Sequence, residues 1–178
     1  MKLRLIPVVV LAVAAPAAGQ QHQMQHEMQH EGDHVVAAIR SIFTGVKTNL
    51  MRAAEAMPEE NYAFAPTPEV RTFGKLIGHV ANANYSYCAG ALGEASPNKA
   101  NIEEAVTDKA GLVKALQESF TYCDRAFAID DMQAMQMNGQ RMRLWNLVQN
   151  TSHDNEHYGN VVTYMRLKGL TPPSSMGR

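Results

Sequence analysis

The stretch 141-RMRLWNLVQNTSHDNEHYGNVVTYMRLKGLTPP-173 decides the fold, because it contains one long helical repeat with a clear end. Apolar side chains recur along it at spacings of three and four and predict an inward stripe of Leu144, Leu147, Val148, Thr151, Val161, Val162 and Met165. Gly169 suits the position just after the last turn, and Pro172 and Pro173 prevent continuation. We therefore predict a helix over residues 141–168 with one face directed toward partner helices.

Three further segments show the same helical period. They cover residues 35–57, 72–92 and 107–127, and Thr72 and Thr107 are the expected capping residues of the second and third. On the first segment the predicted inward stripe is Val35, Ile39, Ile42, Phe43, Val46 and Leu50. No segment alternates at the period of two that a strand requires. Four helices of about 20 residues with apolar stripes predict an all-α four-helix bundle.

The connections between these helices differ in length and composition. Residues 59–71 contain two prolines and no period, so they form a loop. Residues 93–106 are long enough to cross the end of the bundle, so a simple up-and-down topology is not required. Residues 129–140 are also predicted as a loop, in which Asn138 and Gly139 mark a turn.

The chain begins with a segment, residues 1–19, that has the organisation of a secretory signal peptide. Two basic residues precede an apolar run over residues 5–15, and the small residues 17–19 suit a signal peptidase. The apolar run is too short for a membrane anchor, and a buried N-terminal helix is the alternative. We expect cleavage near Gly19 and a periplasmic or secreted protein.

Positive and negative side chains nearly cancel along the chain. There are 16 Lys and Arg and 17 Asp and Glu, for a net charge of −1. A nucleic-acid-binding protein needs a basic face that displaces counterions, and anionic membranes attract polybasic segments. The composition therefore argues against nucleic acid as a partner and leaves small molecules, metal ions and other proteins.

Residues 20–33 form a low-complexity arm rich in histidine and methionine. Histidine recurs every four residues through the arm and into the next helix, with two methionines between, at His22, Met24, His26, Met28, His30 and His34. Short tracts of this kind bind soft or borderline metals such as copper. The interpretation we favour is a solvated arm, because no apolar period ties these residues to a core.

Two cysteines, Cys88 and Cys123, lie on the apolar stripes of the second and third predicted helices. Such a pair forms a disulfide in many exported proteins, and free cysteine is also a common core residue. Both interpretations stay open at this stage. A catalytic thiol is less favoured, because neither cysteine has a histidine close in sequence.

His153 and His157 stand four residues apart in the last predicted helix, so both imidazoles lie on one helix face. Two imidazoles at this spacing can share a metal ion, and His79 is the candidate third ligand. Helical phase turns all three away from their apolar stripes, by roughly 110–150° at about 100° per residue. From the residues alone, they are either ligands beside a solvent-reachable groove or ordinary surface histidines.

Three stretches carry a family resemblance. RTFGKLIGHVANANYSYC (71–88) has a histidine after a threonine-led helix start, NLVQNTSHDNEHYGNVVTYMR (146–166) has the histidine pair followed by Tyr-Gly, and LKGLTPPSS (167–175) forms the ending. In these features the chain resembles the DinB-like superfamily of metal-dependent helical bundles. We therefore assign residues 34–175 to a DinB-like four-helix bundle domain.

The resemblance implies that His79, His153 and His157 together hold one divalent metal ion, with zinc or nickel expected and water on the open side. Asp154 and Glu156 flank the histidine pair on the same helix. We expect these two carboxylates to be solvated or to orient the ligands, not to bind the ion themselves.

The resemblance leaves the reaction open. Characterised members include thiol transferases and an isomerase that use low-molecular-weight thiols, which are scarcer outside the cytoplasm. We expect either a metal-dependent hydrolase or transferase acting on a small molecule, or a non-catalytic metal- or ligand-binding protein. Tyr158 is expected to pack rather than to act, and His34 is a minor candidate for an extra ligand. Family members are often dimers, so a homodimer is a further expectation.

Overall fold

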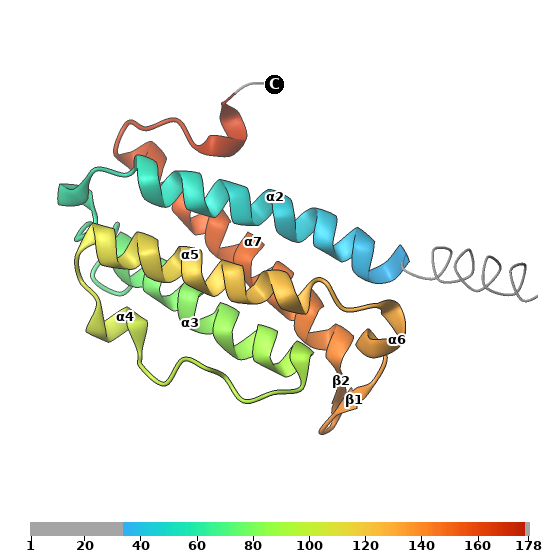
Figure 1. The fold of residues 1–178 in the computed structure, drawn as a ribbon. Helices are drawn as coiled ribbons and strands as arrows, with labels where there is room; N and C mark the ends of the chain where they lie inside the picture. Colours follow the sequence, from blue (N-terminus) through green and yellow to red (C-terminus); the bar gives the residue numbers. More distant parts are fainter. Residues whose placement is uncertain (1–33, 177–178) are drawn as a thin grey trace, which may run out of the picture. The chain divides into compact units, whose positions relative to one another are not determined.

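Four long helices dominate the computed structural model, which describes residues 34–176 (Figure 1). They are α2 His34–Ala56, α3 Phe73–Leu92, α5 Lys109–Ala126 and α7 Arg143–Leu167. This arrangement confirms the predicted all-α four-helix bundle. None of the helices in the described part of the chain is long and apolar enough to cross a membrane. The predicted signal peptide and the arm over residues 20–33 lie outside the described residues.

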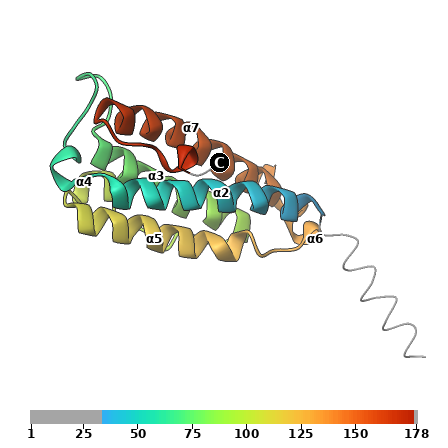
Figure 2. The ribbon, with the colours of Figure 1, turned by 90° about the horizontal axis from the view of Figure 1, so that it is seen from above.

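Each long helix packs mainly against two others, so that the ring runs α2, α5, α3, α7. The helices α3 and α5 run in the same direction, opposite to α2 and α7 (Figures 1 and 2). Because α3 and α5 are parallel, the connection between them returns along the length of the bundle instead of only crossing its end. The short helix α4, Ile102–Ala105, lies within this connection and packs against α3.

Short elements occupy the remaining connections: η1 Glu59–Asn61, α6 Asp131–Ala134, β1 Met137–Asn138, β2 Arg141–Met142 and η2 Pro173–Ser175. The predicted loop over residues 129–140 is therefore wrong in part, because it contains α6 and half of an antiparallel hairpin. A capping box between Asp130 and Gln133 begins α6, and such side-chain bonds leave no trace in hydrophobic periodicity. The predicted turn is confirmed, since Gly139 has a φ of 63°.

Side-chain bonds set the ends of the long helices. Thr72 caps α3 as predicted, accepting a hydrogen bond from the Lys75 backbone N–H at 3.2 Å. The prediction of Thr107 as the cap of α5 is wrong by one residue, because Asp108 accepts from the Gly111 N–H at 2.8 Å. Gly169, with a φ of 73°, follows the end of α7 as expected.

The core is narrower than the predicted stripes. Val35, Ile42 and Val148 were expected to point inward and are 41%, 58% and 44% exposed. Their neighbours Phe43 and Leu147 are at most 1% exposed. In each case the exposed residue precedes or follows a buried position by about 100° of helix rotation, and periodicity does not define how wide the packed face is.

Cys88 and Cys123 form a disulfide that joins α3 to α5, with their Cα atoms 5.2 Å apart. Both residues are completely buried. The bond decides between the two interpretations that the sequence left open. It closes a span of 35 residues and so stabilises the fold by about 3–4 kcal/mol, mainly by constraining the unfolded chain.

Candidate metal centre

His153 and His157 lie one turn apart on α7, and their Nε2 atoms approach to 3.0 Å. The four-residue spacing in the sequence is responsible, because positions i and i+4 stack on one face of a helix. The face on which they lie is directed at α3, since the Nε2 of His153 is also 3.1 Å from the Nε2 of His79. The pair is therefore enclosed between two helices.

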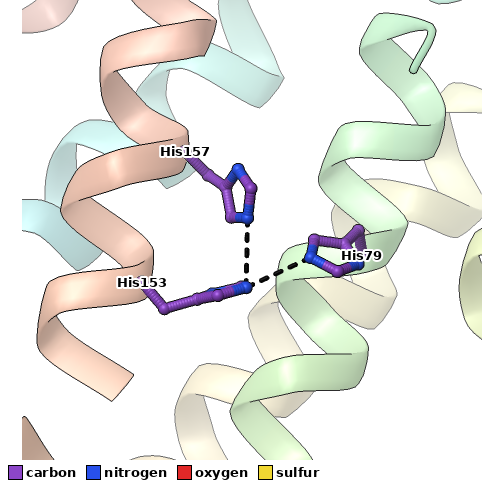
Figure 3. Close-up of side chains that lie close together, drawn as sticks. All are labelled: His79, His153 and His157. Atoms are coloured by element: carbon purple, nitrogen blue, oxygen red, sulfur yellow. Dashed lines mark hydrogen bonds between the residues drawn. The ribbon is translucent and has the colours of Figure 1, made fainter. Parts of the chain in front are cut away.

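His79 projects from α3 toward the pair, so that the three imidazoles converge from two helices (Figure 3). One ring nitrogen from each residue lies within 4.8 Å of the other two. The structure thus brings together all three histidines that the resemblance implied as ligands. They are the group in residues 34–176 that could hold a metal ion through three or more His, Cys, Asp or Glu side chains.

The donor set fits a metal ion. A deprotonated imidazole nitrogen has one lone pair, so the Nε2 of His153 cannot accept good hydrogen bonds from both His79 and His157. An ion between the rings would use all three lone pairs. Tetrahedral zinc with Zn–N bonds of about 2.0–2.1 Å requires nitrogens roughly 3.3 Å apart, close to the 3.0 and 3.1 Å found here.

Burial keeps the imidazoles neutral, as metal ligation requires. His157 is only 8% exposed, and burial, with His153 and His79 nearby, lowers its pKa to about 4. The pKa of His79 is lowered first by burial and then by the Arg71 guanidinium, against the opposite influence of Glu103.

The outward nitrogens of two rings have partners. His79 Nδ1 lies 3.2 Å from Glu103 Oε2, and the other oxygen of Glu103 accepts from Arg71 Nε at 2.8 Å. His157 Nδ1 lies 3.3 Å from Asn160 Nδ2. An imidazole that donates Nδ1–H to a carboxylate keeps its Nε2 lone pair free, so the Glu103 contact favours the tautomer of His79 that binds metal.

Asp154 is buried beside the cluster without a hydrogen bond. The residue is 0% exposed, and its Oδ1 is 3.9 Å from His153 Nδ1, beyond hydrogen-bond distance. Neither carboxylate oxygen nor His153 Nδ1 has a hydrogen-bond partner. Burial raises the pKa of Asp154 to about 6. Of the two roles expected for Asp154, the solvated one is wrong, because the α7 face that carries it is packed.

A cleft of about 640 Å³ opens next to the cluster. It is lined among others by Arg71, Lys75, Glu103, His157, Asn160 and Tyr164. His157 and Glu103 belong both to this cleft and to the cluster. A small molecule in the cleft would therefore lie against the metal-binding side of the bundle, as the groove interpretation of the histidines required.

Three other residues singled out in the sequence lie outside the cluster. Glu156 is exposed, in agreement with the expectation of a solvated carboxylate. Tyr158 packs, since its hydroxyl accepts a hydrogen bond from the Ser174 backbone N–H at 2.9 Å. His34 is exposed at the start of α2 and is not part of the three-histidine group.

Sequence reasoning missed Glu103 and Arg71. Glu103 is 24 residues from His79 and lies in a connection with no regular period. Arg71 was quoted in the predicted second-helix stretch, without a role. The signal that could have found them is weak: two acids directly after the capping-type residue Asn101 indicate a short helix, but not where it docks.

Comparison with known proteins agrees with this fold. The profile of the DinB superfamily matches residues 42–161. A DinB-like protein from Bacillus cereus has 18% identity and a TM-score of 0.64, over 76% of this chain and 93% of that one. A DinB-like protein from Bacillus subtilis has 23% identity and a TM-score of 0.62, over 79% and 99%. These likenesses show the fold alone. No curated protein matches this chain.

Proposed function

The chain belongs to the DinB superfamily, and we propose that in this member His79, His153 and His157 hold one divalent metal ion. The observation that carries the proposal is the convergence of three neutral imidazoles, from α3 and α7, within 4.8 Å of one another. Three protein ligands leave a coordination position open, which distinguishes a reactive or ligand-binding site from a closed structural one.

The ligand set favours zinc or nickel. Imidazole nitrogen suits borderline ions such as zinc, nickel and copper, whereas magnesium and calcium prefer oxygen ligands. No carboxylate oxygen belongs to the three-residue group. The nearest acids act on the ring nitrogens that face away from the cluster or lie beside them, as Glu103 and Asp154 do.

We assign the site to a small-molecule substrate or ligand that enters the cleft beside His157. An ion held by three imidazoles, when bound, polarises a carbonyl group or lowers the pKa of water. The chain itself contributes the cleft, the neutral ligands and the Glu103 carboxylate that orients His79. A hydrolase or transferase acting on a small molecule is the activity class that these features support.

A non-catalytic metal- or ligand-binding protein is the second candidate, and one observation favours it. The polar groups next to the cluster are already engaged. Glu103 contacts His79 and Arg71, and the Tyr164 hydroxyl donates to the Arg71 carbonyl oxygen at 2.7 Å. No free general acid or base is evident among the residues described around the cleft.

We also propose that the protein is exported. The support comes from the signal-peptide pattern of residues 1–19 and from the Cys88–Cys123 disulfide, a bond typical of oxidising compartments. Export would place the site in the periplasm or outside the cell. Edman sequencing of the protein recovered from a periplasmic fraction tests this, and an intact residue 1 in a cytoplasmic fraction would refute it.

Metal analysis of the mature protein tests the site directly. We expect about one zinc or nickel ion per chain, and its loss in His157→Ala. His34→Ala is the matched control, because His34 is an exposed histidine outside the group. Deletion of residues 20–33 separates metal held by the arm from metal held by the bundle. Wild-type protein without stoichiometric metal after loading and dialysis would refute the proposal.

A screen of the metal-loaded protein for hydrolase and thiol-transfer activity separates the two candidate functions. Turnover that disappears in His157→Ala supports the enzyme. Tight metal binding and small-molecule binding without turnover in the same screen support the binding protein.

A further inference from the structure

We propose that Glu103 is the positioning residue of the metal centre, and that α4 docks on α3 in order to hold its carboxylate against His79. This inference rests on the proposed function. It adds a part to the site that comes from neither ligand-bearing helix but from the connection between α3 and α5.

The docking of α4 depends on a glycine next to the ligand. Gly78 precedes His79 on α3, and a Cβ atom at Gly78 would lie 2.7 Å from the Cα and 3.0 Å from the N of Glu103. Real Cβ atoms essentially never approach backbone this closely. The absence of a side chain at Gly78 therefore lets the backbone of α4 lie directly on α3, with Glu103 at the point of contact.

Other contacts fix α4 on the same face of α3. Asn82, one turn after His79, accepts a hydrogen bond from the Ile102 N–H at 3.0 Å and donates to the Asn101 side chain at 2.7 Å. The Ile102 side chain is 7% exposed and belongs to the core. On the other side, Lys75 pairs with Glu104 at 3.0 Å.

The two oxygens of Glu103 have separate partners. Oε1 accepts from Arg71 Nε at 2.8 Å, and Oε2 faces His79 Nδ1 at 3.2 Å. The Glu103 side chain is 15% exposed, so water competes little for these bonds. Arg71 thereby fixes the plane of the carboxylate, and the remaining oxygen is directed at the ring.

This arrangement selects one tautomer of His79. With a hydrogen on Nδ1 donated to Glu103, the Nε2 lone pair points to His153 and His157. The carboxylate also makes the imidazole a better electron donor. Asp154, by contrast, lies beside His153 without a hydrogen bond, so Glu103 is the acid with the geometry of a positioning residue.

The test compares two neighbouring acids of α4 in the full mature chain. Glu103→Gln is expected to weaken zinc binding about 10- to 100-fold in competition with a chromophoric chelator, as removal of an outer hydrogen-bond partner typically does. Glu104→Gln removes the same charge from the same helix but only its exposed pair with Lys75, and should change zinc affinity less than about twofold.

A second measurement reads the positioning itself without metal. Long-range ¹⁵N–¹H NMR of the apoprotein should show His79 with its hydrogen on Nδ1 in wild type and Glu104→Gln, and a shift toward the other tautomer in Glu103→Gln. Gly78→Ala should reproduce both effects by displacing α4 while keeping the carboxylate. Gly45→Ala is its control, because nothing lies within 4 Å of a Cβ at that helical position.

The outcomes separate this inference from the proposed function. Equal zinc affinities in Glu103→Gln and Glu104→Gln, or a hydrogen on Nε2 of His79 in the wild-type apoprotein, would overturn the role of Glu103. Failure of wild type to bind zinc, with the His79 tautomer still dependent on Glu103, would overturn the metal site and leave the positioning contact established.

Discussion

The same two helices, α3 and α7, meet in two polar regions of opposite character. In the sealed region, Asn150 donates to Asn84 Oδ1 at 2.7 Å and Asn84 donates to Ser119 Oγ at 3.1 Å, and all three residues are 0% exposed. Less than two turns away along each helix, His79 and His153 form the histidine region, which borders a cleft.

The two regions differ in how well their polar atoms are matched. In residues 34–176, three of the four buried side-chain polar atoms without a partner belong to His153 and Asp154. The asparagine network has none. A buried polar group without a partner costs about 1–3 kcal/mol. A matched network therefore specifies how the helices pack, whereas an unmatched one indicates a place where a ligand completes the bonding.

The largest effect is expected from removing the disulfide next to the sealed region. Cys88→Ala with Cys123→Ala should lower the free energy of unfolding by about 3–4 kcal/mol, because the 35-residue span is no longer closed in the unfolded chain. Urea denaturation measures this. Zinc affinity of the folded variant should stay within about twofold, and a parallel collapse of affinity would show that the two regions are not independent.

The next effect concerns the histidine region. His157→Ala should weaken zinc binding at least about 100-fold, equivalent to about 2.7 kcal/mol, because one of three ligands is lost. The free energy of unfolding of the apoprotein should change by no more than about 1 kcal/mol. Isothermal titration and thermal melting check the two quantities. Large destabilisation with unchanged zinc affinity would assign His157 to the core instead of the site.

Asn150→Ala should produce the reverse pattern. It leaves Asn84 Oδ1 buried without its donor, so the free energy of unfolding should fall by about 2 kcal/mol while zinc affinity is retained. Asn155→Ala on the same helix is the control, because that exposed amide bonds only to the Thr151 carbonyl, and it should cost less than about 0.5 kcal/mol. Equal losses in the two variants would contradict a structural role for the network.

The smallest effect is expected at Asp154 and depends on pH. Burial raises its pKa from 3.8 to about 6, so its charge destabilises the apoprotein above about pH 6, less between pH 6 and 3.8, and not below. Asp154→Asn should therefore stabilise the apoprotein by about 1 kcal/mol at pH 8, since an unpartnered amide still costs part of the gain. Denaturation at pH 8 and pH 3.5 tests this, and a gain that persists at the lower pH would contradict it.

Acid also affects the histidine region through His157. Its pKa of about 4 lies below the ordinary 6.5, so the folded apoprotein loses stability as the pH falls from 6.5 toward 4. Wild type and Asp154→Asn share this loss, and it cancels in their comparison. Bound zinc should steepen the loss, because protons compete with the ion for the imidazoles.

Periodicity predicted the fold well and the packed faces less well. Each of the four long helices was predicted within about three residues of its ends, because an amphipathic repeat over five turns has few alternative interpretations. Phase placed Asn150 on the same solvent-directed face as the histidines, yet the structure buries it completely. The polar face of α7 is covered by α3, and a helix in isolation contains no information about which neighbour covers it.

The sequence by itself determined the helical bundle, the histidine pair on one face of α7 and, through its resemblance to a known family, the choice of His79 as their partner. Only the tertiary structure decided that His79 meets the pair, that Cys88 bonds to Cys123, and that Glu103 reaches His79 from α4. The physical reason is distance along the chain. Contacts within one helix follow from spacing, whereas contacts between helices depend on how the connections return the chain and on where a residue such as Gly78 lets two backbones meet.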